Sequence, residues 1–190
     1  RVLRDFTATV VLAGAIYAVS LLPWAWWFDA APNLDPVTWA RLLPVTVLGL
    51  LIQTGAEEIA FRGYLQQQLA ARFRSPLVWV ILPALRFGAV HYDPETAGGN
   101  VWILMLAAAA FGLAAADLTA ATGSLGAAWG LHFVNNAMAV ALLSTEGSLS
   151  ELSLFTTPYG AQSDLLPLLI AADLVLLALV WALCRRILRR

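Results

Sequence analysis

One stretch of the chain reads Gln53-Thr54-Gly55-Ala56-Glu57-Glu58-Ile59-Ala60-Phe61-Arg62-Gly63. It follows a nearly continuous apolar run, from residue 40 to residue 52, that is typical of a helix inside a membrane. If the helix continues, Glu58 and Arg62 lie one turn apart with the acid first, and can form an ion pair. Glu57 is then turned about 100° away from that pair. Ionisable groups at membrane depth are costly unless they are paired or functional, so the pattern predicts that Glu58 and Arg62 support the helix and that Glu57 performs chemistry.

The composition of the whole chain agrees with a membrane environment. Of 190 residues, 61% are hydrophobic and 12% are charged, whereas a soluble domain has about 45–50% apolar and about 25% charged residues. Apolar runs near the length needed to cross roughly 30 Å of hydrocarbon recur along the sequence. The sequence therefore predicts an all-α fold, a polytopic transmembrane helix bundle with about six spans. The single cysteine excludes intramolecular disulfides, and nucleic acid is not an expected partner because no basic patch accompanies stacking aromatics.

The six predicted spans belong to one integral membrane domain over residues 1–190, with a motif-bearing core at about 41–143. They are Phe6–Trp24, Arg41–Tyr64, Pro76–His91, Asn100–Leu118, Leu125–Leu143 and Leu165–Leu183. Arginines fall on one side of these spans and most acidic residues on the other, so the positive-inside rule predicts that both termini are cytoplasmic. Because the chain begins at Arg1 rather than Met, the sequence does not define whether a further span precedes it.

Two connections carry expectations of their own. The second and third spans are predicted to form an antiparallel hairpin with its turn near Arg74-Ser75-Pro76, since proline suits a first helical turn. Counting outward from that turn brings position 57 level with position 91, so we expect Glu57 and His91 to meet across the hairpin. Residues 144–162 form the longest polar connection, which we expect to be a loop rather than a short interfacial helix.

Both histidines of the chain, His91 and His132, fall in predicted spans. Phe87 precedes His91 by one helical turn, and Asn136 follows His132 by one turn, so each pair shares a helix face. A lone histidine at such a position is often a helix–helix hydrogen bond, but two of them beside an unpaired glutamate favour a reactive site. Residues 126–130 form a GxxxG spacing that lets another helix approach closely.

These groups together suit peptide-bond hydrolysis by activated water. A buried glutamate can act as a general base near neutral pH, which is the role we expect for Glu57, with His91 sharing the water or protonating the leaving amine. His132 and the Asn136 amide are donors suited to a developing oxyanion. If zinc is bound instead, Glu57, His91 and His132 would hold it. A reaction without a cofactor is favoured because the chain has no HExxH motif and no second thiol.

Four further polar residues lie in predicted spans and are given structural roles. Arg86 falls where an apolar residue is expected, about 140° around the helix from His91. We expect it to point away from the site and to pair with Asp117 or Asp173. Asn135 is expected to form a helix–helix hydrogen bond.

Three short motifs in order give the sequence a resemblance to a known family. They are Glu57-Glu58-Ile59-Ala60-Phe61-Arg62, Phe87-Gly88-Ala89-Val90-His91 and His132-Phe133-Val134-Asn135-Asn136. These match the EExxxR, FxxxH and HxxxN pattern, and the chain from about Gly55 to Val140 resembles the CPBP family of intramembrane endopeptidases, which includes the type II CAAX prenyl proteases. The resemblance implies that Glu57 and His91 activate water, that His132 and Asn136 stabilise the oxyanion, and that Glu58, Arg62 and Phe87 support them.

The resemblance also implies a location and a substrate class. The compact length and the arginine-only basic set favour a bacterial relative in the inner (plasma) membrane, in contact with the lipid bilayer, acting on a peptide or a lipidated protein. A second hypothesis is a non-catalytic scaffold or self-protection (bacteriocin-immunity-like) protein of the same family. A third is a small proton-coupled transporter, against which the absence of a visible inverted repeat counts.

Overall fold

The computed structural model describes residues 1–189, apart from the side chains of Ser148 and Leu149. Its α-helices are α1 (Val2–Trp27), α2 (Pro36–Glu58), α3 (Gln66–Arg72), α4 (Leu82–Ala89), α5 (Pro94–Ala97), α6 (Val101–Thr122), α7 (Leu125–Ala137) and α8 (Leu166–Leu188). Three π-helical segments, η1 (Ile59–Leu65), η2 (Leu77–Ile81) and η4 (Met138–Leu142), continue or precede these helices, and η3 (Gly98–Asn100) and η5 (Ser148–Leu152) are 3₁₀ turns. The strands are β1 (Ala31–Pro32), β2 (Leu143–Glu146) and β3 (Phe155–Gly160).

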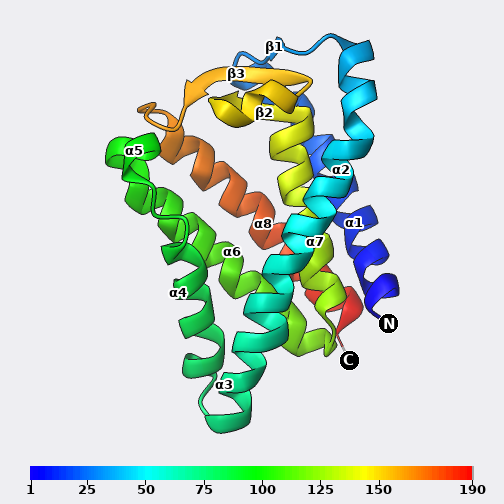
Figure 1. The fold of residues 1–190 in the computed structure, drawn as a ribbon, viewed down its shortest axis with the longest axis vertical. Coiled ribbons are helices and arrows are strands. Elements are labelled where there is room, and N and C mark those ends of the chain that lie inside the picture. Colours follow the sequence, from blue (N-terminus) through cyan, green and yellow to red (C-terminus); the bar gives the residue numbers. More distant parts are fainter. Residues whose placement is uncertain (190) are drawn as a thin grey trace.

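The predicted polytopic helix bundle is confirmed. Five helical stretches are long and apolar enough to cross a membrane, namely Val2–Trp27, Pro36–Arg72, Pro94–Thr122, Leu125–Leu142 and Leu166–Leu188. The shorter apolar stretch Leu77–Ala89 runs beside them and accounts for the remaining predicted span. In Figure 1 the chain enters and leaves the bundle at the same end, which fits an even number of passes. The protein is therefore an integral membrane protein with close to six spans.

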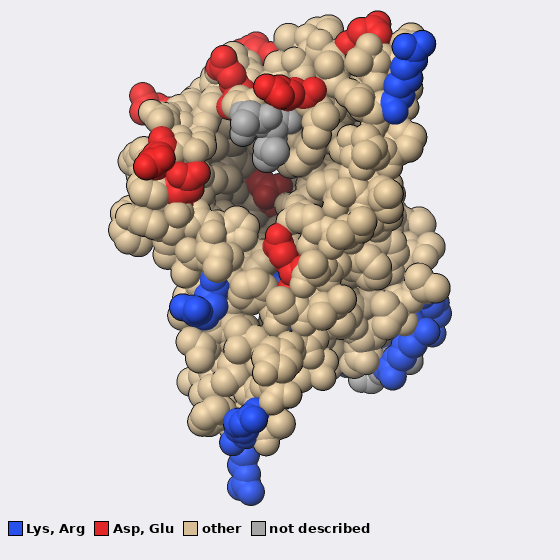
Figure 2. Space-filling model, viewed as in Figure 1, with Lys and Arg blue, Asp and Glu red and all other residues tan. Residues whose placement is uncertain are grey.

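The predicted hairpin between the second and third spans is present, and its turn lies where expected. α3 ends at Arg72, and η2 begins directly after Pro76. Figure 1 shows this turn projecting at the end of the molecule that also carries the two termini. Arginines gather mainly at that end and acidic side chains mainly at the opposite end (Figure 2).

A small sheet caps the acidic end of the bundle, where a loop was expected for residues 144–162. β3 lies between its two neighbours, antiparallel to β1 and parallel to β2. The hydroxyl of Ser144 in β2 is hydrogen-bonded to the hydroxyl of Ser153, just before β3, at 2.7 Å. The indole nitrogen of Trp39 donates to Ala141 O at 2.7 Å, which ties the start of α2 to the end of η4. The loop prediction was wrong because β3 pairs with β1, which is far away in sequence, and with β2 in parallel rather than through a hairpin turn, so a local pattern does not show the pairing.

The helices on either side of the site begin and end at residues with defined chemistry. The Asp35 carboxylate accepts from Thr38 N at 2.9 Å and caps α2. α6 ends at Thr122 and is followed by Gly123, whose φ of 62° is in the left-handed region that favours glycine. Ser124 then accepts from Gly126 N at 3.1 Å and caps α7, the helix that carries His132.

Glycines bring α1 and α7 into direct backbone contact, which confirms the close approach that the GxxxG spacing predicts. A Cβ at Gly126 would lie 2.1 Å from Val2 O, and one at Gly130 would lie 2.7 Å from Phe6 O. Gly88 does the same between α4 and α6, where a Cβ would lie 2.6 Å from Met105 O. Helix packing in lipid relies on such contacts because it gains little from the hydrophobic effect.

Gly126 and Gly14 therefore make a matched pair for a stability test. Gly126→Ala is expected to lower the free energy of unfolding in detergent by about 1–3 kcal/mol, the usual cost of overpacking. Outside its own helical turn, no atom of the described residues lies within 4 Å of a Cβ built at Gly14, so Gly14→Ala is expected to be neutral or to stabilise the helix by up to about 1 kcal/mol. Equal unfolding of the two variants would contradict the close packing of α1 on α7.

Candidate active site

The centre of the site is a buried ion pair at the junction of α2 and η1. Arg62 Nη1 lies 2.9 Å from Glu58 Oε1, and both side chains are only 1% exposed. The pair predicted from the sequence spacing is thus present. Arg62 Nη2 also donates to Gly112 O of α6 at 3.2 Å. This ion pair fixes the end of α2 against α6.

Aromatic rings enclose the guanidinium of this pair. The Arg62 Cζ atom lies 4.6 Å from the centroid of the Phe87 ring. Phe61 and Phe111 lie farther out, with centroids at 5.8 and 5.9 Å from the same atom. A cation over an aromatic face is stabilised by the ring quadrupole, so Phe87 supports the arginine as well as forming a wall of the site.

His132 reaches the same buried carboxylate from α7. Its Nδ1 lies 2.8 Å from Glu58 Oε1, and the ring is buried. An ionised carboxylate accepts hydrogen bonds, so it favours the tautomer with the proton on Nδ1 and leaves Nε2 free for chemistry. That Nε2 atom lies 3.7 Å from Glu57 Oε2. Glu58 therefore orients His132 toward the neighbouring glutamate.

Contacts between α2 and α7 set the relative position of these groups. Trp129 Nε1 donates to Thr54 Oγ1 at 3.2 Å. The same indole lies flat against Gly55, where a Cβ would lie 3.2 Å from its ring. The glycine just before the two glutamates thus lets α7 come close enough for His132 to reach both of them.

Glu57 differs from Glu58 in being accessible, with 31% of its side chain exposed. Gln53 Nε2 donates to Glu57 Oε1. Asn136 Nδ2 in turn donates to Gln53 Oε1 at 3.2 Å. The structure therefore brings four of the polar groups together in one chain of contacts, from His132 through Glu57 and Gln53 to Asn136.

Gln53 was not among the predicted site residues. The signal that could have found it is its spacing, because it precedes Glu57 by one helical turn in a run of otherwise apolar residues. An amide there can donate to the glutamate and accept from a partner helix at the same time.

A groove runs from this chain of contacts along α2 and η4. It has a volume of about 520 Å³, and its lining is Val45, Thr46, Gly49, Leu50, Gln53, Asn136, Val140 and Leu152. All but Thr46, Gln53 and Asn136 are apolar or glycine. Figure 2 shows a hollow in the face of the molecule seen in that view, with acidic side chains inside it. The polar groups of the site thus lie at one end of an apolar groove.

His91 is hydrogen-bonded at the end of its own helix rather than to Glu57, which the hairpin count predicts it to meet. Within residues 1–189, no hydrogen bond or ion pair joins the two side chains. His91 lies beyond the last residue of α4, and its Nδ1 is 2.7 Å from Phe87 O. The count assumed straight α-helices, whereas η1 and η2 are π-helical and change the register on both arms. The Phe87 ring lies beside both histidines, with its centroid 4.8 Å from the His91 ring and 5.7 Å from the His132 ring.

The expected partners of Arg86 were also wrong. Asp117 accepts from Arg185 Nε at 2.7 Å and from Trp181 Nε1 at 2.9 Å. Asp173 lines a separate cavity on α8. Arg86 itself is exposed, as expected for a side chain that points away from the site. The sequence prediction did not include the arginines at the end of α8 as partners of Asp117, although Arg185 pairs with Asp117 in α6.

The donor set does not fit a zinc ion as the alternative prediction requires. No three His, Cys, Asp or Glu side chains in the described part of the chain are grouped as metal ligands. Glu57 Oε2 and His132 Nε2 are two candidate metal-ligand atoms that lie near one another. The Nδ1 atom of His91 is instead hydrogen-bonded to the Phe87 carbonyl. A zinc site commonly has at least three protein ligands, so we derive no step through a metal.

The fold and the site define the protein as a polytopic membrane protein with a glutamate–histidine centre inside its helix bundle. A sequence profile of the family described as type II CAAX prenyl endopeptidase Rce1-like matches residues 38–138, which is more than half of the chain and contains all three motifs. The chain belongs to this family.

The chain is also similar to one bacterial protein. The chain is 32% identical over 122 residues to the uncharacterized protein YyaK of Bacillus subtilis (strain 168). This similarity covers 63% of the chain and 40% of the relative, so the chain matches less than half of that protein's length. No solved structure matches the chain.

Proposed function

We propose that the protein is an intramembrane endopeptidase that hydrolyses a peptide bond of a membrane-associated or lipidated substrate with water activated by Glu57. The observation that carries the proposal is the placement of an accessible Glu57 carboxylate 3.7 Å from His132 Nε2, at the end of an apolar groove. Membership of a family of prenyl endopeptidases supports the reaction class.

The first step concerns the attacking water. Polar atoms 3.7 Å apart are too far for a direct hydrogen bond and are commonly joined by water. A water between Glu57 Oε2 and His132 Nε2 donates one hydrogen to each. Glu57 takes a proton from this water while the water oxygen forms a bond to the carbonyl carbon of the substrate. The carbonyl π electrons move to oxygen, which becomes an oxyanion.

The second step needs a donor for the oxyanion and a proton for the leaving nitrogen. The Asn136 amide, which donates to Gln53 in the resting structure, turns to the oxyanion when substrate displaces that contact. Collapse of the intermediate breaks the C–N bond, and the proton held by Glu57 passes to the amine. His91 is exposed and lies beside the Phe87 ring, and we propose that it contacts the leaving-amine side of the substrate.

The environment of the groove suggests the kind of substrate. Its apolar walls and its place within a membrane-spanning bundle suit the apolar side chains of a peptide anchored at the bilayer. By the positive-inside rule we also assign the arginine-rich end, with both termini, to the cytoplasm of a bacterial cell.

Gly49 offers a test of the groove as the substrate path. Outside its own helical turn, no atom of the described residues lies within 4 Å of a Cβ built at Gly49, so a Gly49→Leu side chain starts in open space and adds bulk to the groove. We expect KM for a peptide with a large apolar side chain to rise about tenfold or more, while the unfolding temperature stays within a few degrees. Gly14→Leu adds the same bulk outside the groove and serves as the control. An unchanged KM in Gly49→Leu would remove the groove from the substrate path.

The reaction itself is tested with a library of lipidated and unlipidated peptides, incubated with the purified chain in detergent. We expect cleavage by wild type with and without a chelator, and a strong loss in His132→Asn. Inhibition by the chelator that zinc reverses would contradict the metal-free reaction. Failure of the folded wild-type chain to cut any peptide would favour the non-catalytic scaffold hypothesis.

A further inference from the structure

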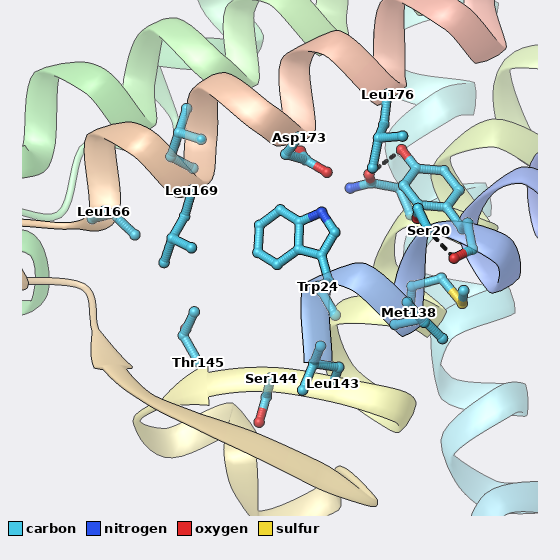
Figure 3. Close-up of a pocket in the computed structure, with 15 residues that line it drawn as sticks. Ser20, Trp24, Met138, Leu143, Ser144, Thr145, Leu166, Leu169, Asp173 and Leu176 are labelled. Atoms are coloured by element: carbon cyan, nitrogen blue, oxygen red, sulfur yellow. Dashed lines mark hydrogen bonds between the residues drawn. The ribbon is translucent and has the colours of Figure 1, made fainter. Parts of the chain in front are cut away.

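A second cavity shares no lining residue with the groove beside the glutamate centre. It has a volume of about 270 Å³ and is bounded by α1, α7, η4, β2 and α8. Figure 3 shows its lining, with Trp24, Leu169 and Asp173 projecting into it from opposite helices. The volume is just below that of sites for drug-sized ligands, which are about 300–1,000 Å³. It therefore suits one side chain or a small molecule.

Asp173 is the unusual member of this lining. Of the described residues that bound the cavity, it alone carries a charge, and most of the others are apolar. Within residues 1–189 its carboxylate has no hydrogen bond or ion pair. A carboxylate inside a membrane bundle is costly unless it is paired or functional. A cation bound beside Asp173 would therefore stabilise it.

The polar groups near Asp173 do not supply that cation. The Tyr17 hydroxyl donates to Asn135 Oδ1 at 3.0 Å, which confirms the predicted helix–helix role of Asn135. Ser20 donates its hydroxyl to the Tyr17 carbonyl of its own helix at 2.8 Å. Both groups are neutral and already engaged.

The aromatic and apolar parts of the lining indicate what kind of cation fits. The indole of Trp24 offers a π face, which attracts ammonium groups. Asp173 lies seven residues into α8, about 10 Å along its axis from the acidic end of the bundle. A ligand that enters from that end needs an apolar stem to bring its charge to the carboxylate, and Leu166, Leu169 and Ile170 line this path.

We propose that this cavity is a binding site for a primary ammonium carried on a short alkyl stem, with Asp173 as the counter-ion, Trp24 as the aromatic wall and the leucines of α8 around the stem. Such a group is found both in small alkylamines and in lysine side chains. The site shares no lining residue with the groove and does not depend on the proposed peptidase reaction.

The test compares two ligands with the same stem. n-Hexylammonium and 1-hexanol are titrated calorimetrically into the purified full chain in an uncharged detergent. Hexylammonium is expected to bind saturably at one site, about tenfold or more tighter than hexanol, since hydrogen bonds to charged groups contribute roughly a tenfold factor. Equal affinity for the two ligands, or no saturable binding of hexylammonium, would overturn the proposal.

Two variants assign the binding to Asp173. Asp173→Asn keeps the shape of the side chain and is expected to lose the preference for hexylammonium. Asp164→Asn removes the same charge from an exposed position just before α8 and is expected to bind like wild type. Retained preference in folded Asp173→Asn would contradict the site. If that variant fails to fold, the two-ligand comparison on wild type still decides the proposal.

A competition arm identifies the natural source of the ammonium. A short peptide with one lysine and the same peptide with Nε-acetyllysine are each added to the hexylammonium complex. Competition by the lysine peptide alone assigns the site to a lysine side chain, whereas competition by neither peptide assigns it to a free alkylamine. Equal competition by both peptides would contradict recognition of the charge.

Discussion

Glu57→Gln is expected to abolish most of the peptidase activity, with kcat reduced by about 10²–10⁴, the range attributed to general acid–base groups. The amide keeps the size of the side chain but cannot take a proton from water. Glu57 is 31% exposed and is not part of the buried ion pair, so the unfolding temperature is expected to stay near that of wild type. Activity is measured as peptide cleavage under saturating substrate.

Glu151→Gln is a suitable control for this experiment, because Glu151 is an exposed carboxylate in η5 and does not itself line the groove. It is expected to keep the activity of wild type. If Glu57→Gln remained as active as Glu151→Gln, Glu57 would not be the base. If Glu57→Gln lost activity only together with its fold, the role of Glu57 would be structural.

Arg62→Met is expected to produce the largest loss of stability, about 3–5 kcal/mol in the free energy of unfolding, which is typical when one partner of a buried ion pair is removed. Methionine fills much of the space of the arginine side chain. It leaves the buried Glu58 carboxylate with its hydrogen bond to His132 but without the ion pair to Arg62. It also removes the cation that lies over the Phe87 ring. The measurement is reversible unfolding in detergent by denaturant.

The partly exposed pair of Asp117 and Arg185 gives a matched comparison. Their side chains are 32% and 39% exposed, so Arg185→Met is expected to cost only about 0–1 kcal/mol. Combining Glu58→Gln with Arg62→Met neutralises the buried charge and is expected to recover a large part of the loss. An Arg62→Met variant as stable as Arg185→Met would show that the buried pair does not support the bundle.

Much of the fold could be predicted because its causes are local in sequence. Apolar length predicts the spans, Pro76 marks the hairpin turn, and the glycines at 126 and 130 indicate a close helix contact. The small sheet could not be predicted, because β3 pairs with β1, which is distant along the chain, and with β2 in a parallel arrangement that no hairpin turn indicates. Its short segments carry no strong alternation of their own.

The site shows the same division between local and distant information. The Glu58–Arg62 pair follows from spacing on one helix, and it is present. The distance between Glu57 and His91 depends on the register of two helices, and the π-helical segments that change this register have no clear signal in the sequence. The contact of His132 with Glu58, which selects its tautomer, appears only when α7 packs on α2.

The central claim is that Glu57 directs water to a peptide bond, and cleavage in ¹⁸O-labelled water tests it most directly. Wild type and Glu57→Gln are incubated with the peptide library in labelled water, with a chelator present, and the products are analysed by mass spectrometry. The account predicts a new peptide carboxyl that carries one ¹⁸O atom with wild type, and almost no product with Glu57→Gln. Labelled product formed equally by Glu57→Gln, or no product from folded wild type on any peptide, would contradict it.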